Sequence, residues 1–180
     1  MPNYRRNFQP GATYFFTVVL RDRDSNLLAH YIHALRAAYR EVRNRLPFRT
    51  DAIVVLPDHL HAVWTLPAGE TDYPARWRLI KAGFSRRIPR IIGAVGPVGH
   101  GRGERGIWQR RYWEHTIRDG ADFANHIDYI HFNPVRHGHV SRVADWRWSS
   151  FHRYVREGTY PLDWGGVSGE EPAVTGEPRT

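Results

Sequence analysis

The chain has 180 residues, and 41% of them are hydrophobic, so it can bury the core of one domain without disulfides. It contains no cysteine, which excludes thiolate metal sites and a cysteine nucleophile and fits a reducing compartment. No segment approaches the roughly 18 apolar residues of a membrane span, and the first residues lack the apolar stretch of a signal peptide. We therefore expect a cytoplasmic protein that has no membrane partner.

The charge points to nucleic acid. The formal net charge is +8, and Lys81 is the only lysine among 26 basic residues. Arginine binds phosphate with two parallel donors and stacks on bases. Arginines alternate with aromatic residues at 4–6, 76–78, 110–113 and 146–148, as in platforms for single-stranded nucleic acid. A genome rich in G and C would also favour arginine over lysine, but it would not produce eight excess positive charges, so we expect nucleic-acid binding.

The first half of the chain has strand and helix patterns in turn. Hydrophobic spacing predicts, in order, a strand over 12–20, a helix over 27–46, and strands over 48–56 and 59–66. The last two strands meet at the Pro57–Asp58 corner and should form an antiparallel hairpin. Pro74 is placed to begin a second helix. Strand, helix, strand, strand, helix is most of a split βαβ sandwich.

The second half completes this fold. A strand over 108–117 would close the sheet, and Asp119 is placed to cap a helix that runs to Asn133, where Pro134 should stop it. We therefore predict an α+β fold, a ferredoxin-like split βαβ sandwich in which helices pack on an antiparallel sheet.

Two segments have the composition of flexible chain. Residues 88–106 contain six glycines and two prolines, which predicts a flexible insertion. Residues 165–180 are polar and rich in glycine and proline, which predicts a disordered tail. We expect a single domain over 1–164.

A pair of histidines, His59 and His61, lies in an apolar run with strand character. Alternation along a strand aims both imidazoles to one side and Leu60, Ala62 and Trp64 to the other, core-facing side. Backbones about 6 to 7 Å apart allow the two rings to share one divalent metal. The sequence therefore makes a metal site a serious hypothesis.

Spacing alone is weak evidence for this site. With 11 histidines in the chain, about 0.7 such pairs would arise by chance. A second pair, His137 and His139, follows the predicted last helix, and we expect it to contact DNA phosphate or solvent rather than to form a second metal site.

The predicted last helix carries two stripes. Phe123, Ile127 and Ile130 form an inward apolar stripe, whereas Tyr129 and Asn133 project together on a different face. Laid over the histidine strand, a phenol one turn from a carboxamide would supply a nucleophile and an oxygen ligand. A half-buried tyrosine followed by an asparagine that caps the helix would give the same spacing, and spacing alone leaves both interpretations open.

Several motifs together resemble one family. His59-Leu60-His61, followed by the segment 128–138 (DYIHFNPVRHG), resembles the REP-associated tyrosine transposases, a branch of the HUH single-tyrosine endonucleases. The likeness spans roughly residues 4–164 and includes further motifs at 11–17, 108–115 and 145–151. The insertion at 88–106 is longer than we expect for the family.

The resemblance implies a site and a substrate. It maps the paired histidines of the family onto His59 and His61, the nucleophilic tyrosine onto Tyr129, and the third metal ligand onto Asn133. It implies that the tyrosine helix lies across the sheet, that Mg²⁺ or Mn²⁺ is the cofactor, and that the substrates are single-stranded DNA hairpins from repetitive extragenic palindromes.

The chemistry implied by the resemblance is transesterification. Tyr129 would attack a DNA phosphorus, leaving a 5′-phosphotyrosine and a free 3′-hydroxyl that can rejoin the strand by the reverse step. Because free tyrosine has a pKa near ~10, deprotonation needs help from the metal, a water on it, or a nearby base such as His126 or His131. Two imidazoles suit Mn²⁺ or Zn²⁺ better than Mg²⁺, which prefers oxygen ligands, and the sequence leaves the choice open.

Further residues have less specific roles. Tyr112 is the reserve nucleophile. The predicted DNA contacts are Arg5, Arg6, Arg110, Arg111, Arg118 and, as a base-stacking ring, Trp148. The main alternative function is a regulator that binds structured DNA or RNA on a ferredoxin-like fold without cutting it. A replication initiator or relaxase would carry different tyrosine motifs. The sequence leaves open whether the protein is a monomer or a homodimer.

Overall fold

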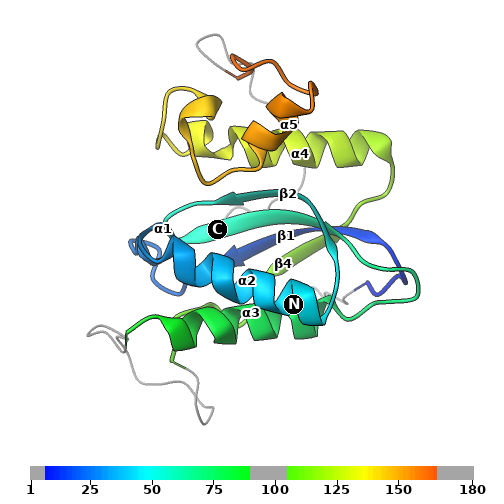
Figure 1. Cartoon of the computed structure of the whole chain (residues 1–180), viewed down its shortest axis with the longest axis vertical. Helices are drawn as coiled ribbons and strands as arrows, with labels where there is room; N and C mark the ends of the chain where they lie inside the picture. The colour runs from blue at the N-terminus through cyan, green and yellow to red at the C-terminus, as the bar shows by residue number, and fades with distance from the viewer. Residues whose placement is uncertain (1–6, 90–104, 166–180) are drawn as a thin grey trace, which may run out of the picture.

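A computed structural model describes residues 7–89 and 105–165 of the chain (Figure 1). Four strands form one antiparallel sheet in the order β2-β3-β1-β4, which confirms the predicted α+β fold. The strands are β1 (Thr13–Val19), β2 (Arg49–Val55), β3 (His59–Thr65) and β4 (Trp113–Thr116). Arg5, Arg6, most of the predicted insertion and nearly all of the predicted tail lie outside the described residues.

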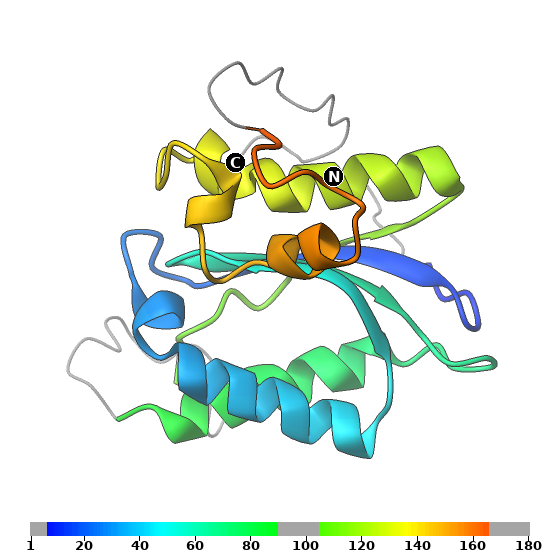
Figure 2. The same cartoon turned by 45° about the horizontal axis from the view of Figure 1, so that its top comes forward.

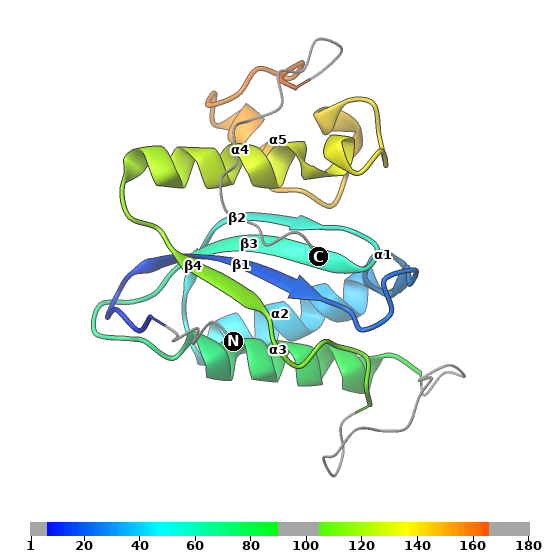
Figure 3. The same ribbon diagram turned by 180° about the vertical axis from the view of Figure 1, so that it is seen from behind.

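Helices α2 (Ile32–Arg45) and α3 (Tyr73–Arg87) cover one face of the sheet (Figure 3). The Asp72 side chain accepts a hydrogen bond from the Ala75 backbone N–H (2.9 Å) and so caps α3, whose second residue is proline. The layer between these helices and the sheet is apolar and aromatic. At its centre the indoles of Trp64 and Trp77 stack with centroids 4.1 Å apart.

Helix α4 (Gly120–Arg136) crosses the opposite face, and Figure 2 shows it with α5 (Phe151–Arg156) above the sheet. A 3-10 turn, η1 (Val143–Asp145), connects the two helices. The Asp119 carboxylate accepts from the Asp122 backbone N–H (2.8 Å) and caps α4, as predicted. Val63 of β3 and Ile127 and Ile130 of α4 belong to the apolar cluster between helix and sheet. The sheet is therefore covered on both faces.

Three predicted boundaries differ from the structure. The helix expected over 27–46 is two helices, α1 (Leu27–His30) and α2, because Tyr31 leaves helical torsions (φ −104°, ψ 35°). Helix α4 does not end before Pro134 but continues to Arg136. A proline in the last turn costs one backbone hydrogen bond, and the amide of His137 still bonds to the Asn133 carbonyl (3.0 Å).

The last strand is shorter than predicted because its edge bulges. Trp113 pairs with Thr17 and Trp108 bridges to Leu20, so the four residues 109–112 lie opposite only two residues, 18 and 19. The additional residues include Arg110 and Arg111, which are exposed. Regular pairing is therefore confined to β4.

Among the described residues, no helix combines the length and the hydrophobicity needed to cross a bilayer.

Candidate active site

His59 and His61 lie on the side of β3 that faces α4, as strand alternation predicts. Their rings have centroids 5.0 Å apart, and only 4% and 1% of the two residues is exposed. Leu60, Ala62 and Trp64 belong to the core on the α2 and α3 side. The histidine face of the sheet is a second buried layer rather than a solvent-exposed surface.

Tyr129 lies on α4 next to this pair. Its ring centroid is 5.1 Å from that of His61 and 5.9 Å from that of Phe15, which also stacks on His61 at 5.5 Å. The structure thus brings the phenol and the imidazoles together. Because Tyr129 is only 3% exposed, a phosphodiester can reach its hydroxyl only after neighbouring side chains move.

A hydrogen bond at Nδ1 orients each imidazole. His59 Nδ1 donates to the Asp58 carboxylate (2.7 Å), which is also paired with Arg23 Nε (2.6 Å). His61 Nδ1 shares a hydrogen bond with the Thr17 hydroxyl (2.9 Å). Metal-binding histidines are usually oriented in this way, through the ring nitrogen that does not bind the metal. Nε2 is therefore the nitrogen with which each ring would bind a cation.

The protonation states suit metal binding. Burial lowers the pKa of His61 well below 6.5, and the charges of neighbouring basic side chains lower it further, so the imidazole is neutral at neutral pH. Burial acts to raise the pKa of Asp58, but the hydrogen bond from His59 and the charges of His59 and Arg23 outweigh it. The Asp58 carboxylate is therefore ionised and can hold the His59 ring.

Asn133 lies one turn beyond Tyr129 on α4. It is fully buried, and neither amide atom has a hydrogen-bond partner within residues 7–89 and 105–165. A buried polar group without a partner costs about 1–3 kcal/mol, whereas a carboxamide oxygen is a good ligand for a hard divalent cation. The chemistry of two imidazoles and a carboxamide fits the implied Mg²⁺ or Mn²⁺, so His59, His61 and Asn133 stay the predicted ligands.

Two residues at the end of α4, Arg136 and His137, also lie beside this site, although the predicted stripe on this helix ended at Asn133. The Arg136 guanidinium carbon is 5.5 Å from the Tyr129 ring centroid, and the His137 ring is 5.1 Å from that of His59. Because α4 continues through the proline, His137 falls on the same stripe as Tyr129 and Asn133. The same spacing of four residues, continued by one turn beyond Asn133, predicts that His137 lies on this face.

The structure separates the reserve residues from the site. The Tyr112 ring lies on the opposite side of the sheet, with centroids 6.1 Å from Phe16 and 6.3 Å from Trp77, so it cannot replace Tyr129. His131, one suggested base, points away from Tyr129: its Nε2 bonds to the Ser150 hydroxyl (2.9 Å). Burial lowers the pKa of His131 to about 3.

The other suggested base, His126, belongs to a group that fastens the start of α4 to the edge of the sheet. Asp122 accepts hydrogen bonds from His115 Nε2 (2.8 Å) and from the Arg118 backbone N–H (2.9 Å). His126 Nδ1 donates to the Asp122 carbonyl (2.7 Å), and its ring contacts Phe15 (4.7 Å). Phe15 also contacts His61 and Tyr129, so this group positions the tyrosine helix.

The predicted DNA contacts are distributed over the surface. Arg110 and Arg111 are exposed at the bulge before β4, and Arg118 is exposed but paired with Asp122 (3.2 Å). The half-buried ring of Trp148 has the Arg147 guanidinium 4.4 Å above it. Contacts of these residues with DNA remain predictions.

Similar proteins place the chain in a family. No family model matches it. A REP-associated tyrosine transposase of Escherichia coli strain K12 is 46% identical over 166 residues, which cover 92% of each chain. A relative from Haemophilus influenzae that carries the same family name is 48% identical over 92% of this chain and 94% of its own. The chain belongs to the REP-associated tyrosine transposases.

A solved structure supports the fold of this transposase over nearly its whole length. That structure, a REP-associated tyrosine transposase bound to a REP hairpin, is 42% identical. It covers 98% of this chain and 100% of its own with a TM-score of 0.81. The resemblance inferred from the motifs around His59 and Tyr129 is confirmed.

Proposed function

We propose that this transposase is a metal-dependent endonuclease and transesterase that cuts and rejoins single-stranded DNA at palindromic hairpin repeats. The observation that carries the proposal is the 5.1 Å separation of the Tyr129 and His61 rings, with a second imidazole 5.0 Å further on. A nucleophile next to a preorganised pair of metal ligands is what phosphoryl transfer to a side chain requires. The solved relative bound to a REP hairpin suggests the substrate.

In the proposed reaction, the deprotonated Tyr129 oxygen attacks a phosphorus of the strand. A bond forms between that oxygen and phosphorus, and the bond from phosphorus to the 3′-oxygen breaks. The upstream strand leaves as a 3′-hydroxyl after taking up a proton, and the downstream strand stays attached as a 5′-phosphotyrosine. Since the ester is conserved, a 3′-hydroxyl can attack it in reverse and restore the strand, with Tyr129 as the leaving group.

The surrounding residues have distinct tasks in this proposal. Asp58 and Thr17 hold the two imidazoles in the orientation needed for binding a cation. The Arg136 guanidinium lies near the Tyr129 ring, where its charge favours the phenolate and attracts a phosphate. When bound by His59, His61 and Asn133, the divalent metal would neutralise negative charge on the phosphate oxygens.

The test uses hairpin DNA from a palindromic repeat with an adjoining unpaired strand, labelled at the 5′ or the 3′ end, and Mn²⁺. We expect the 3′ label to remain attached to denatured wild-type protein, because the downstream strand is the one bonded to the tyrosine. Tyr129→Phe should form no adduct and release no 3′-hydroxyl fragment, yet bind the hairpin within about twofold, because one hydroxyl is lost from a buried ring. Tyr31→Phe, outside the site, is the matched control and should cut normally.

Each other outcome rejects part of the proposal. An adduct that persists in Tyr129→Phe would reject the nucleophile. Trapping of the 5′ label would reverse the polarity of the reaction. Binding by the wild type without any adduct or fragment, at any divalent metal, would favour the alternative of a regulator that binds structured DNA or RNA without cutting it.

A further inference from the structure

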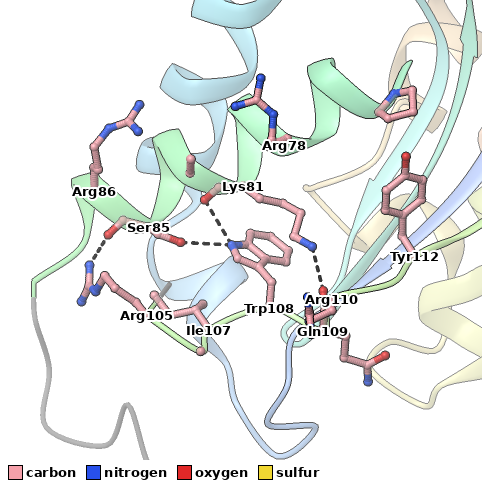
Figure 4. Close-up of a pocket in the computed structure, with 13 residues that line it drawn as sticks. Arg78, Lys81, Ser85, Arg86, Arg105, Ile107, Trp108, Gln109, Arg110 and Tyr112 are labelled. Atoms are coloured by element: carbon pink, nitrogen blue, oxygen red, sulfur yellow. Dashed lines mark hydrogen bonds between the residues drawn. The ribbon is translucent and has the colours of Figure 1, made fainter. Parts of the chain in front are cut away.

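A basic groove lies on the other side of the molecule from Tyr129, between α3 and the segment before β4 (Figure 4). It encloses about 600 Å³. Its walls include five cationic side chains, and none of the described residues that line it is acidic. The cations are Arg78, Lys81, Arg86, Arg105 and Arg110.

Two of these cations donate hydrogen bonds to neutral acceptors in the described part of the chain. Lys81 Nζ donates to the Gln109 carbonyl (2.7 Å), and Arg105 donates to the Ile88 carbonyl (3.0 Å), so both are held by neutral acceptors. Arg78 and Arg86 are exposed and form no ion pair within the described part of the chain. The groove therefore presents a positive field that suits an anionic ligand.

The floor of the groove is rigid. Trp108 Nε1 donates to the Lys81 carbonyl and to the Ser85 hydroxyl, both at 3.2 Å, which fixes the indole against α3 (Figure 4). The Trp108 ring also packs edge-on against Phe84 at 5.4 Å. A fixed aromatic floor with guanidinium groups around it is a surface that can bind a phosphate backbone.

The spacing of the cations indicates a polymer rather than a single small anion. Arg78 and Arg86 are eight residues apart on α3, which separates their backbones by about 12 Å. Arg110 approaches from the opposite wall. One phosphate group cannot engage all three, whereas a nucleic-acid strand presents a phosphate at each nucleotide along the groove.

The lining of the groove ends beside the edge of the sheet, with Tyr112. Tyr112 lines the groove on the α3 side, and Trp113, the next residue, begins the edge strand on the α4 side. Trp113 pairs with Thr17, which pairs in turn with His61. Strands about 4.8 Å apart place the Trp113 backbone about 10 Å from that of His61.

We propose that this groove binds the phosphate backbone of the double-helical stem of the DNA substrate. The adjoining unpaired strand then passes over Trp113 to Tyr129. The course of the unpaired strand to Tyr129 rests on the proposed function. Binding of the stem in the groove does not depend on DNA cutting.

The experiment measures binding alone, in the Tyr129→Phe background, by fluorescence anisotropy over a range of salt concentrations. One probe is the labelled hairpin with its unpaired tail, and the other is the tail without the stem. Arg78→Gln with Arg86→Gln removes two charges from the groove. Arg36→Gln with Arg40→Gln, two exposed arginines of α2 outside the groove, removes the same charge as a control.

We expect the groove variant to bind the hairpin at least tenfold more weakly than its parent, with the salt slope reduced by about 2. Its affinity for the tail should fall far less, and the control variant should bind the hairpin within twofold of the parent. Equal losses for the two variants, or equal losses for the two probes, would overturn the proposal. Thermal unfolding of each variant checks that these surface changes leave the fold intact.

Failure of this test is distinguishable from failure of the proposed function. A protein that forms no covalent adduct can still show the selective loss of hairpin affinity, which supports the groove. A protein that cuts normally but loses no hairpin affinity in the groove variant keeps its nucleophile and rejects the groove.

Discussion

The two faces of the sheet are buried to the same degree but are built from different chemistry. On the α2 and α3 side, Trp64, Trp77 and Phe16 form an aromatic layer with centroids 4.1–5.5 Å apart. On the α4 side, the polar side chains of His59, His61, His126 and Asn133 are buried among apolar residues. Burying polar groups costs free energy unless they are paired. The comparison indicates that the aromatic face stabilises the fold while the α4 face maintains a costly arrangement for chemistry.

The largest effect is expected on the aromatic face. Trp64→Ala should lower the free energy of unfolding by about 3–5 kcal/mol, because it removes a fully buried indole stacked on Trp77. Denaturant unfolding measures this loss. Leu162→Ala, at a position that is 62% exposed, should change stability by less than about 0.5 kcal/mol. A small effect of Trp64→Ala would contradict the view that the aromatic face dominates the free energy of unfolding.

An effect of the opposite sign is expected on the α4 face. Asn133→Leu replaces a buried amide that lacks partners among the described residues with an apolar side chain that has the same branching. We expect the metal-free protein to gain about 1–2 kcal/mol of stability and to lose metal-dependent cutting. Urea unfolding in the presence of a chelator, together with the cutting assay, measures both. A loss of stability would show that the amide has a structural role.

A third substitution tests positioning without removing a metal ligand. Thr17→Val preserves the shape of the side chain but deletes the hydroxyl that bonds to His61 Nδ1. We expect metal affinity or cutting to fall about 10- to 100-fold, with stability lowered by about 1 kcal/mol. Titration with Mn²⁺ should show the weaker binding, and Thr17→Ser should restore it. Equal loss in both variants would point to packing instead of the hydrogen bond.

The smallest effect at neutral pH is expected at His131, which acts mainly on the pH dependence of stability. His131 has a pKa near 6.5 when unfolded and about 3 when folded, because burial disfavours its charged form, as do the charges of Arg153 and His152. The unfolded chain therefore binds more protons between pH 6.5 and 3, and stability falls as pH falls through this range.

His131→Gln, which can preserve the bond to Ser150, should make this fall in stability shallower. The change at pH 7 should be within about 1 kcal/mol. Unfolding curves at several pH values would measure the slope, and an unchanged slope would mean that other groups cause it. His61 and His126, whose pKa values burial also lowers, contribute to the slope that remains.

Local patterns predicted much of the fold. Alternation along residues 59–66 was sufficient to assign the faces of His61 and Trp64, and the hairpin at Pro57 followed from its turn residues. Long-range geometry was not accessible in the same way. Propensity favours a helix end before Pro134, but the packing of α4 on the sheet outweighs the single lost hydrogen bond, and this extension brings His137 beside His59.

The candidate site was predictable only in part for a related reason. The spacing of Tyr129 and Asn133 suggested a shared face of a helix, but no local pattern could show that Arg136 or Thr17 would approach the same point. The basic groove is still less local, because Arg78 and Arg110 come from segments that meet only in the folded chain. Charge composition indicated a nucleic-acid partner but gave no position for it.

Because side chains alternate along β3, the length of this strand decides which residues face the core and which face the proposed active site. Insertion or deletion of one codon within residues 59–64 would shift the register and exchange the two sides of the strand. A change between positions 59 and 61 would turn the two imidazoles to opposite sides, and a change between 61 and 64 would put Trp64 on the same side as His61. Changes of length are therefore expected in the connecting turns of related proteins. Within β3, a change of one residue would disrupt the site in a single step.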